Sequence, residues 1–198
     1  MPHPESIHTV KSRKGFRTRR ALLDAAFELI ADHGITHLTI AAISEAVGLT
    51  RSSAYNHFPD LSAVLDAVSE DVLDRIGEMS GVRAETRMRG LSLTTERLKF
   101  VLSLSSRHPK IARVLSELYL HHDPSAAAIE RRIRADIHVD IGDNRLRLRK
   151  RETANYARIV VASAMATLRY RTLFPDKRIS NATVLRLLLD PVRPAGES

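Results

Sequence analysis

The chain has 198 residues, which is enough for one large domain or two small ones. Its 31 Lys and Arg residues outnumber its 23 Asp and Glu residues, and the formal net charge of +8 favours polyanionic partners. Cysteine is absent, which excludes disulfides and thiolate metal sites.

The beginning of the chain, MPHPESIHTV, lacks the basic stretch followed by an apolar stretch that marks a signal peptide. The longest run of apolar and small residues, 159–168, is about half of the roughly 20 residues needed to cross a bilayer. The sequence therefore predicts a cytoplasmic protein with no membrane partner.

Residues 1–15 are predicted to form a disordered basic arm. The first ten are polar, include two prolines and show no periodicity. Residues 11–20, KSRKGFRTRR, hold six positive charges and no acidic residue. Such a run is either a solvated tail or a contact for a polyanion, and composition alone leaves both open.

Three helices are predicted within residues 16–60. The first covers residues 18–33, and the other two lie on either side of Gly48, each preceded by a capping threonine, Thr39 and Thr50. Three helices in so short a span, the last two joined by a turn containing Gly, have the shape of a helix-turn-helix unit.

Residues 61–198 are also predicted to be helical. Apolar spacing, capping residues and prolines indicate a long helix from Leu61 to about residue 79, followed by helices over residues 94–106, 109–121, 123–142, 152–174 and 181–190. In the helix over residues 123–142, Asp123 is expected to be the cap and Pro124 the first helical residue. The sequence holds no internal repeat and no convincing strand. The fold class is therefore predicted to be all-α, with about nine helices.

The helix predicted after Thr50 has one apolar side and one polar side. At 100° per residue, Ala54 and Phe58 share the side that must be buried. The opposite side and its flanks hold Ser52, Ser53, Tyr55, Asn56 and His57. Small donors and acceptors suit base edges and phosphates: Asn pairs with adenine, and Arg51 has the reach for guanine. The alternative is a polar helix that is merely solvated.

The stretch LTIAAISEAVGLTRSSAYNHF, residues 38–58, resembles the DNA-binding head of the TetR family of bacterial regulators. The matching features are the apolar residue and Thr at the start, the Ala-Ile-x-x-Ala-Val-Gly helix and turn, and the closing Tyr-x-His-Phe. A Leu- and Val-rich helix, LSAVLDAV, follows as in that family. The motif-level resemblance covers residues 16–68, and the length and helical remainder agree with the whole architecture.

The resemblance implies roles for individual residues in binding double-stranded DNA. Thr39 would hold a phosphate with its hydroxyl and the neighbouring free amides. Thr50, Tyr55 and His57 would contact the DNA backbone, and Arg51, Ser52, Ser53 and Asn56 would face bases, with Tyr55 able to do either. Lys14 and Arg17 of the arm are expected at phosphates or the minor groove. The family commonly has Lys where this chain has Leu61, so that phosphate contact is expected to be missing.

A helix-turn-helix head reads too few base pairs to be selective alone, so a homodimer on a near-palindromic operator is expected. In the TetR family the last two helices form the dimer contact, and small residues in ANYARIVVASAMATL allow close helix approach. The residues predicted at this interface are Val160, Ala164, Leu168, Val184, Leu185 and Leu188. The alternative is a single helix buried in the core of a monomer.

Family members usually hold a small-molecule effector in the C-terminal domain, here residues 61–198. The residues expected to line its pocket are Tyr119, His122, Tyr156 and Met165, although each is also a plausible core member. The basic run Arg145–Arg151 either attracts an anionic ligand or is a solvated loop. No cofactor is expected, and His138 between Asp136 and Asp140 does not share a helical face with them, so no metal site is predicted.

The function predicted from these features is that of a ligand-responsive, dimeric, sequence-specific transcriptional repressor. The alternative is a structural DNA-binding protein of nucleoid type, without a specific operator or effector. An enzyme is not expected, because the sequence has no phosphate-cradling glycine loop, no His-Glu-x-x-His and no nucleophile elbow.

Overall fold

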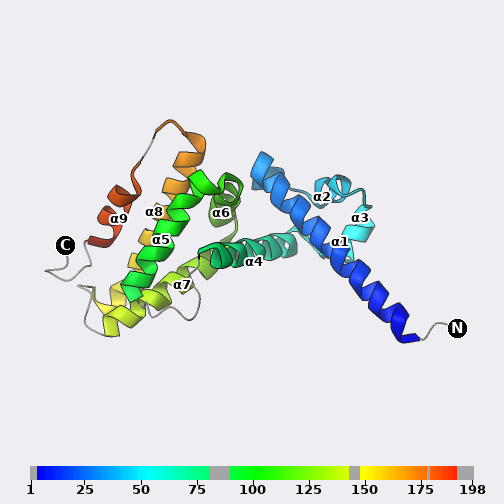
Figure 1. Cartoon of the computed structure of the whole chain (residues 1–198), viewed down its shortest axis with the longest axis horizontal. Helices are drawn as coiled ribbons and strands as arrows, with labels where there is room; N and C mark the ends of the chain where they lie inside the picture. The colour runs from blue at the N-terminus through cyan, green and yellow to red at the C-terminus, as the bar shows by residue number, and fades with distance from the viewer. Residues whose placement is uncertain (1–3, 81–89, 143–147, 178, 191–198) are drawn as a thin grey trace. The chain divides into compact units, whose positions relative to one another are not determined.

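The computed structural model describes residues 4–80, 90–142, 148–177 and 179–190. Within these ranges the regular elements are nine α-helices and two short 3-10 helices (Figure 1), so the all-α prediction is confirmed. The chain divides into two compact units, residues 1–71 and 72–198, and the boundary falls within helix α4. None of the helices in the described ranges combines the length and the apolarity needed to span a bilayer.

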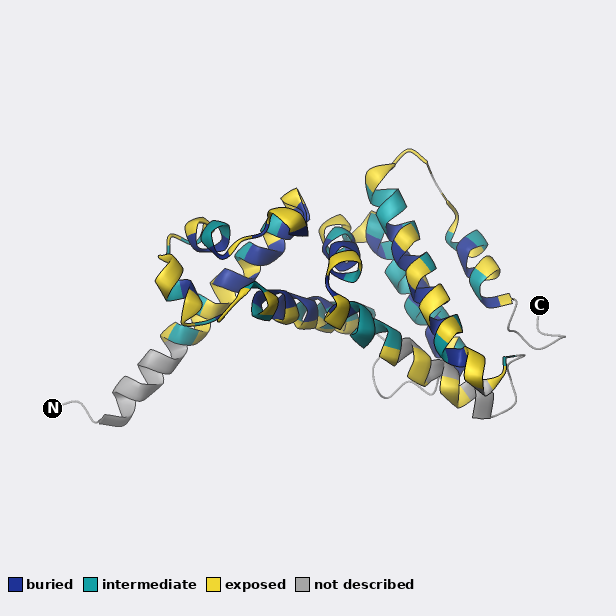
Figure 2. Cartoon of the chain, turned by 180° about the vertical axis from the view of Figure 1, so that it is seen from behind, coloured by how far each residue is buried: buried dark blue, intermediate teal, exposed yellow. Residues whose placement is uncertain are grey.

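The first unit holds helices α1 to α3 and the first half of α4. Its elements are α1 (Pro4–His33), η1 (Ile35–His37), α2 (Ile40–Ala46), α3 (Arg51–Tyr55) and α4 (Leu61–Ser80). Each helix contributes apolar side chains to one core, which includes Leu22, Ile30, Ile43, Phe58 and Val64. Colouring by exposure shows these buried faces turned inward on the helices (Figure 2).

Helix α1 begins at Pro4, whereas the sequence predicted a disordered arm through residue 15 and a helix from Thr18. Thr18 caps nothing: its hydroxyl donates to the carbonyl of Lys14, one turn earlier in the same helix, at 3.0 Å. Proline is tolerated in a first turn, and the single Gly15 costs a helix only about 1 kcal/mol. No residue between them ends the helix, which explains the correction.

The turn between α2 and α3 requires a glycine. Gly48 adopts a φ of 67°, in the left-handed region that residues with a Cβ avoid. Its amide donates to the carbonyl of Glu45 at 3.0 Å, and the amide of Leu49 donates to the carbonyl of Ser44 at 2.9 Å. These bonds satisfy the last carbonyls of α2 and set the direction in which α3 leaves.

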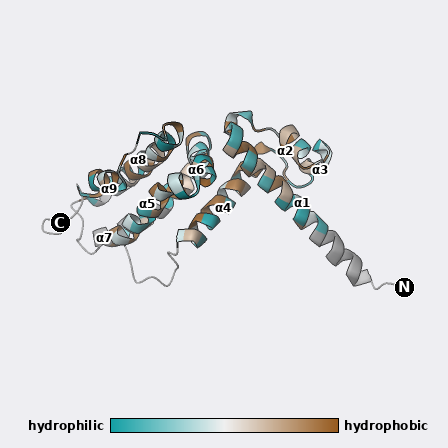
Figure 3. Ribbon diagram, turned by 45° about the horizontal axis from the view of Figure 1, so that its top comes forward, coloured by the Kyte–Doolittle hydropathy of each residue, from teal (hydrophilic) through white to brown (hydrophobic). Residues whose placement is uncertain are grey.

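The second unit is a bundle formed by the remaining helices. Besides the second half of α4 it holds α5 (Gly90–Arg107), α6 (Pro109–His121), α7 (Asp123–Gly142), η2 (Lys150–Glu152), α8 (Thr153–Leu173) and α9 (Asn181–Leu189). Helix α8 packs against α5, α6 and α7, and α9 lies mainly on α5. Most helices carry apolar and hydrophilic residues on different sides (Figure 3).

Among the described residues, two Arg–Glu pairs join α8 to neighbouring helices of this bundle. Arg169 of α8 donates to the buried carboxylate of Glu117 of α6. Arg158 of α8 donates to the carboxylate of Glu130 of α7 at 3.2 Å. Both links fasten α8 to a neighbour with a charge-assisted hydrogen bond.

Several helix ends differ slightly from the sequence prediction. Helix α5 begins at Gly90, so Thr94 lies inside it rather than capping it. Helix α7 begins at Asp123, and the cap position belongs to His122, whose carbonyl accepts from the amide of Ala126 at 3.3 Å. A cap predicted from a single residue can be displaced when the neighbouring residues also adopt helical conformation, so helix ends shift by a few residues.

The glycine at the turn is testable by substitution. We expect Gly48→Ala to lower the free energy of unfolding by about 1–2 kcal/mol, because an L-residue pays that cost in the left-handed region. A Cβ at Gly48 meets no atom within 4 Å, so the cost is conformational rather than steric. Denaturant unfolding of the full chain measures it.

Gly77→Ala is the matched control, because Gly77 lies in α4 with equally open space around its Cα. That substitution should stabilise the chain by about 0.5–1 kcal/mol, the usual gain from Ala in a helix interior. Equal effects from the two variants would contradict the conformational role of Gly48.

Candidate nucleic-acid interface

Helix α3 presents polar side chains on an exposed face. Arg51, Ser52, Tyr55 and Asn56 are all exposed, and more than half of the Tyr55 surface is accessible. On the opposite side Ala54 is 1% and Phe58 2% exposed. The structure therefore brings four of the predicted DNA-contacting residues together on one face that the first unit leaves open to solvent.

The beginning of α3 is fixed by a capping network. The hydroxyl of Thr50 accepts from the amide of Ser53 at 3.2 Å and lies 3.0 Å from the hydroxyl of Ser53. Ser53 is consequently half-buried and already engaged within the helix. Of the polar residues predicted at bases, Ser53 is the one with the least freedom to contact another molecule.

The end of α3 is a turn rather than a continued helix. Asn56 and His57 follow the last helical residue, Tyr55. Asn56 keeps helical backbone angles, with φ −68° and ψ −17°, and the amide of Phe58 still donates to the carbonyl of Ala54 at 3.0 Å. The faces derived from helical spacing therefore persist through Phe58, with Asn56 exposed and His57 half-buried.

Thr39 caps α2 in the same way that Thr50 caps α3. Its exposed hydroxyl accepts from the amide of Ala42 at 3.1 Å. A threonine hydroxyl that accepts one bond still has its own O–H to donate. Thr39 can therefore cap its helix and donate to an anionic oxygen at the same time.

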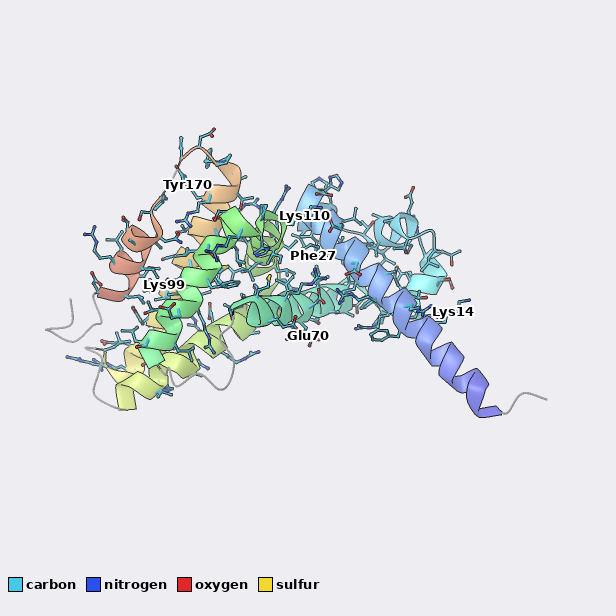
Figure 4. The ribbon with its side chains drawn as sticks, viewed as in Figure 1. Lys14, Phe27, Glu70, Lys99, Lys110 and Tyr170 are labelled. Atoms are coloured by element: carbon cyan, nitrogen blue, oxygen red, sulfur yellow. The ribbon has the colours of Figure 1, made fainter. Side chains whose placement is uncertain are left out.

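The basic residues of α1 divide into two groups. Lys14, labelled in Figure 4, Arg17, Arg19 and Arg20 are all exposed, but they differ in their contacts. Arg19 places its guanidinium 4.7 Å from the centre of the Phe58 ring, and Arg20 bonds both Asp24 and Asp71. The side chains of residues 11 and 13 lie outside the described part of the chain.

Arg20 ties α1 to α4. One guanidinium nitrogen lies 2.6 Å from Asp71 Oδ1, and another lies 2.9 Å from Asp24 Oδ1. The hydrogen bond to Asp24 is the main reason that the pKa of Arg20 is raised, and the bond to Asp71 adds to it. Arg20 therefore pairs with two carboxylates of the first unit.

The start of α4 agrees with the departure noted in the sequence. Asp60 Oδ1 accepts from the amide of Ala63 at 2.8 Å and caps the helix. Leu61, where TetR-family heads commonly have Lys, is half-buried and brings no charge. Any phosphate contact near this end must come from other residues.

The predicted dimer-interface residues lie largely inside the second unit. Val160, Ala164 and Leu168 of α8 are fully buried by the chain's own helices, and Val184 and Leu185 of α9 are nearly so. Leu188 is half-buried. Within one copy of the chain, all of these residues except Leu188 therefore belong to the core, and their place in a dimer interface stays a prediction.

A different face of α8 remains exposed. Ile159 is 59% and Leu173 56% exposed, and Ala162 and Ala166 lie between them at helical spacing. Exposed residues follow α8 as a stripe in Figure 2. Leu187, on the adjacent helix α9, is 68% exposed. We call Ile159, Ala162, Ala166 and Leu173 the outer stripe of α8.

A small apolar cavity of about 60 Å³ lies within the second unit. Its lining comes from α4, α5, α6, α7 and α8: Leu73, Ile76, Arg97, Leu98, Val101, Leu115, Ile129, Val161, Ala164 and Met165. Of the four residues predicted to line an effector pocket, the structure places Met165 at this cavity.

The other three predicted pocket residues bond elsewhere. The Tyr119 hydroxyl bonds the Glu130 carboxylate, and burial, followed by the charge of Glu130, raises the pKa of Tyr119. The Tyr156 hydroxyl donates to the carbonyl of Leu188 at 2.6 Å, and His122 Nδ1 lies 2.9 Å from the Ser125 hydroxyl. Their polar tips join helices to one another.

Sequence reasoning missed the contribution of α5 to the cavity. Leu98 and Val101 recur at helical spacing, and Arg97 is a cation beside them. That spacing was the available signal. The spacing predicts that this face of α5 is buried, but it does not predict that a cavity remains between this face and the neighbouring helices.

A larger groove of about 650 Å³ lies where α5 and α8 end and α9 begins. Arg171 lines it and donates to the carbonyls of Leu102, at 2.7 Å, and Ile179. Burial lowers the pKa of this guanidinium. Arg171 thereby fastens the segment before α9 onto α5, which gives it a structural role.

Neither metal site nor anion loop gains support from the second unit. Among the described residues, no group of three or more His, Asp and Glu could hold a metal ion. Residues 145–147 of the predicted run Arg145–Arg151 lie outside the described residues, and Arg149 and Arg151 are exposed.

Comparison with known proteins gives agreement over the first unit. Residues 22–68 match the family model described as bacterial regulatory proteins, tetR family. The chain is 30% identical over 106 residues to the HTH-type transcriptional regulator AcrR of Shigella flexneri, covering 52% of this chain and 48% of that protein. The chain spans about half the length of the curated relatives it matches.

Solved structures share the fold of nearly the whole chain. A TetR-family transcription regulator from Shewanella sp. PV-4 has a TM-score of 0.71 at 14% identity, covering 89% of this chain and 98% of that one. RolR, solved in complex with resorcinol, has a TM-score of 0.64 at 18% identity, covering 91% of this chain and 90% of that one. At these identities the likeness is one of fold.

The link between Arg20 and Asp71 is testable by a double-mutant cycle. We expect Arg20→Ala and Asp71→Ala each to lower the free energy of unfolding, with a coupling energy of about 0.5–1 kcal/mol, because the pair is only partly screened by solvent. Denaturant unfolding of the two single variants and the double variant gives that energy. Strict additivity would show that the contact contributes nothing to holding α1 against α4.

Proposed function

We propose that this chain, which belongs to the TetR family of bacterial regulatory proteins, is a repressor that binds a near-palindromic operator as a homodimer and responds to a small-molecule effector. The family is one of DNA-binding transcriptional regulators, and the chain is not an enzyme.

One observation carries the DNA-binding proposal. The exposed face of α3 is polar but nearly uncharged, while the opposite face is sealed in the core by Ala54 and Phe58. A surface helix with no partner would ordinarily carry Glu, Lys and Arg, which are good helix formers and soluble. Side chains such as Asn56 and Ser52 are suited to reading base edges in the major groove.

The remaining contacts divide between bases and backbone. Arg51 reaches for guanine from the first turn of α3, and Tyr55 contacts either a base or the sugar-phosphate backbone. Thr39, Thr50 and His57 hold phosphates, while Lys14 and Arg17 add charge from α1. Because Arg19 and Arg20 already contact other groups of the unit, they contribute less to the salt dependence of binding than Lys14 and Arg17.

The homodimer is proposed to form through the outer stripe of α8 and the exposed side of α9. The small side chains of Ala162 and Ala166 let a second helix approach closely, and Ile159, Leu173 and Leu187 supply exposed apolar surface at this face. Two heads held about 34–36 Å apart would reach successive major grooves on one side of the duplex.

The effector is proposed to bind in the cavity that Met165 and α5 line. RolR, which shares the fold, was solved with resorcinol, which supports a small organic ligand for this architecture. An effector changes operator affinity only through a difference in its own affinity for two states, typically worth about 1–3 kcal/mol.

Selection of bound duplexes from a random pool tests the proposal against its alternative, a structural DNA-binding protein. A repressor dimer should enrich a near-palindromic consensus. A protein that binds through charge alone should enrich none, since phosphate contacts carry no sequence information. Failure to enrich any sequence would overturn the proposed function.

Asn56 is the most informative single residue on the reading face. We expect Asn56→Ala to weaken binding to the selected duplex by about 1–3 kcal/mol, because an amide pairing with a base edge is lost. Binding to a random duplex of the same length should change little. Fluorescence anisotropy on both duplexes measures the difference, and an equal loss on both would mean that Asn56 does not read bases.

The dimer face is tested by introducing charge. We expect Ile159→Glu to shift the chain from dimer to monomer at micromolar concentration, since a carboxylate buried between two copies is strongly disfavoured. Leu120→Glu is the matched control, because Leu120 is a 53% exposed apolar residue on another helix, α6, and is not part of the outer stripe. Light scattering after size-exclusion chromatography gives the masses, and a dimeric Ile159→Glu variant would place the interface elsewhere.

A further inference from the structure

The cavity in the second unit has an unusual combination of lining residues. Nine of the ten are aliphatic or Met, and the remaining one is Arg97. No aromatic ring and no acidic side chain appears among the described residues that line it. A planar aromatic ligand therefore finds no ring to stack on, and a cation finds no opposite charge.

A polar group lies on the same face of α5 as the cavity lining. Arg97, Leu98 and Val101 all line the cavity, and Thr94 precedes Leu98 by one helical turn. Thr94 is fully buried, and its hydroxyl oxygen has no hydrogen-bond partner among the residues that the structure describes. A buried polar group left without a bond is costly, and such groups are rare enough in native proteins to need a reason.

Arg97 brings the second polar group. Its Nη1 atom is shielded from solvent, although the residue as a whole is only half-buried. A guanidinium has five N–H donors in a fixed fork, so it can keep contacts within the chain and still offer a donor to a ligand. Its planar fork matches a carboxylate better than any other common ligand group of similar size.

We propose that the effector is an aliphatic carboxylate whose carboxylate group binds Arg97 and accepts from the Thr94 hydroxyl, with its hydrocarbon chain among Ile76, Val161 and Met165. The assignment rests on the proposed function, in which this unit holds the effector. It goes further by stating the ligand class, an anion at one end and saturated hydrocarbon at the other.

The size of the cavity adds a requirement. A volume of about 60 Å³ is under half of the roughly 150 Å³ of an engineered cavity that accepts benzene. A ligand longer than a few carbons must therefore displace a side chain. Met165 is the best suited, because its unbranched side chain has three rotatable bonds and repacks at low cost.

Calorimetric titration of the full-length chain without DNA tests the ligand class directly. The probes are hexanoate, octanoate and decanoate, with 1-octanol and octylamine as neutral and cationic matches. We expect octanoate to bind at least tenfold more tightly than either match, and each added pair of methylenes to tighten binding by about tenfold, the gain for two buried CH₂ groups.

Substitutions then locate the carboxylate. Arg97→Met should remove the preference for octanoate over 1-octanol while preserving the apolar stem. Thr94→Val should weaken octanoate severalfold, and a Met165→Trp variant, which fills the cavity, should abolish binding of all chain lengths. Lys99→Met is the matched control: Lys99, labelled in Figure 4, is an exposed cation two residues further along α5 that bonds Glu96, and its loss should change nothing.

The outcomes are separable from those of the proposed function. Equal affinity for octanoate, octanol and octylamine, no binding at all, or an unchanged preference in a folded Arg97→Met variant would overturn this inference, even where the chain still binds its selected duplex. Loss of sequence-specific DNA binding would instead overturn the proposed function. If Arg97→Met does not fold, the ratio of affinities in the unsubstituted chain and the Thr94→Val variant still decide.

Discussion

The seating of Ala54 and Phe58 in the core is the contact on which the candidate interface depends. Helix α3 has only five residues by its hydrogen-bond pattern, and isolated helices so short are not stable in water. Its conformation is therefore held by packing on one side, by the Thr50 cap at its start and by the turn at Gly48 before it. Because two buried side chains fix the rotation of α3 about its axis, they also fix which residues face solvent.

Contacts within the first unit also explain why the basic residues of α1 are not equivalent. Arg19 lies over the ring of Phe58, and Arg20 bridges two aspartates, so both cations contribute to the structure of the unit that they precede in sequence. All four of these cations are exposed, but Lys14 and Arg17, on the same helix, take no part in those contacts. A count of positive charges thus overstates what is available to a polyanion, since part of the charge is already matched inside the protein.

Local signals explain how far the sequence could predict this fold. Thr39, Thr50 and Gly48 determine the conformation of residues close to them in sequence. The two caps and the turn that they predict are therefore found in the structure. Helix α8 is different, because apolar residues surround its axis and its composition does not distinguish Val160 from Ile159. Only packing against α5, α6 and α7 places Val160 in the core and leaves Ile159 on the surface. The cavity could not be predicted for the same reason, since it is the space that five helices leave between them.

Helix α8 joins the two proposals about the second unit, because its opposite faces serve different purposes. Val161, Ala164 and Met165 line the cavity, and Ile159, Ala162 and Ala166 lie on the outer stripe. A ligand that displaces Met165 must act on the helix that carries the proposed dimer contact. Close-packed interiors transmit such a change, because neighbouring side chains have few voids into which to relax. Such a ligand regulates operator binding only if it binds the DNA-binding and the released state with different affinities; with equal affinities it would stabilise the protein without regulating it.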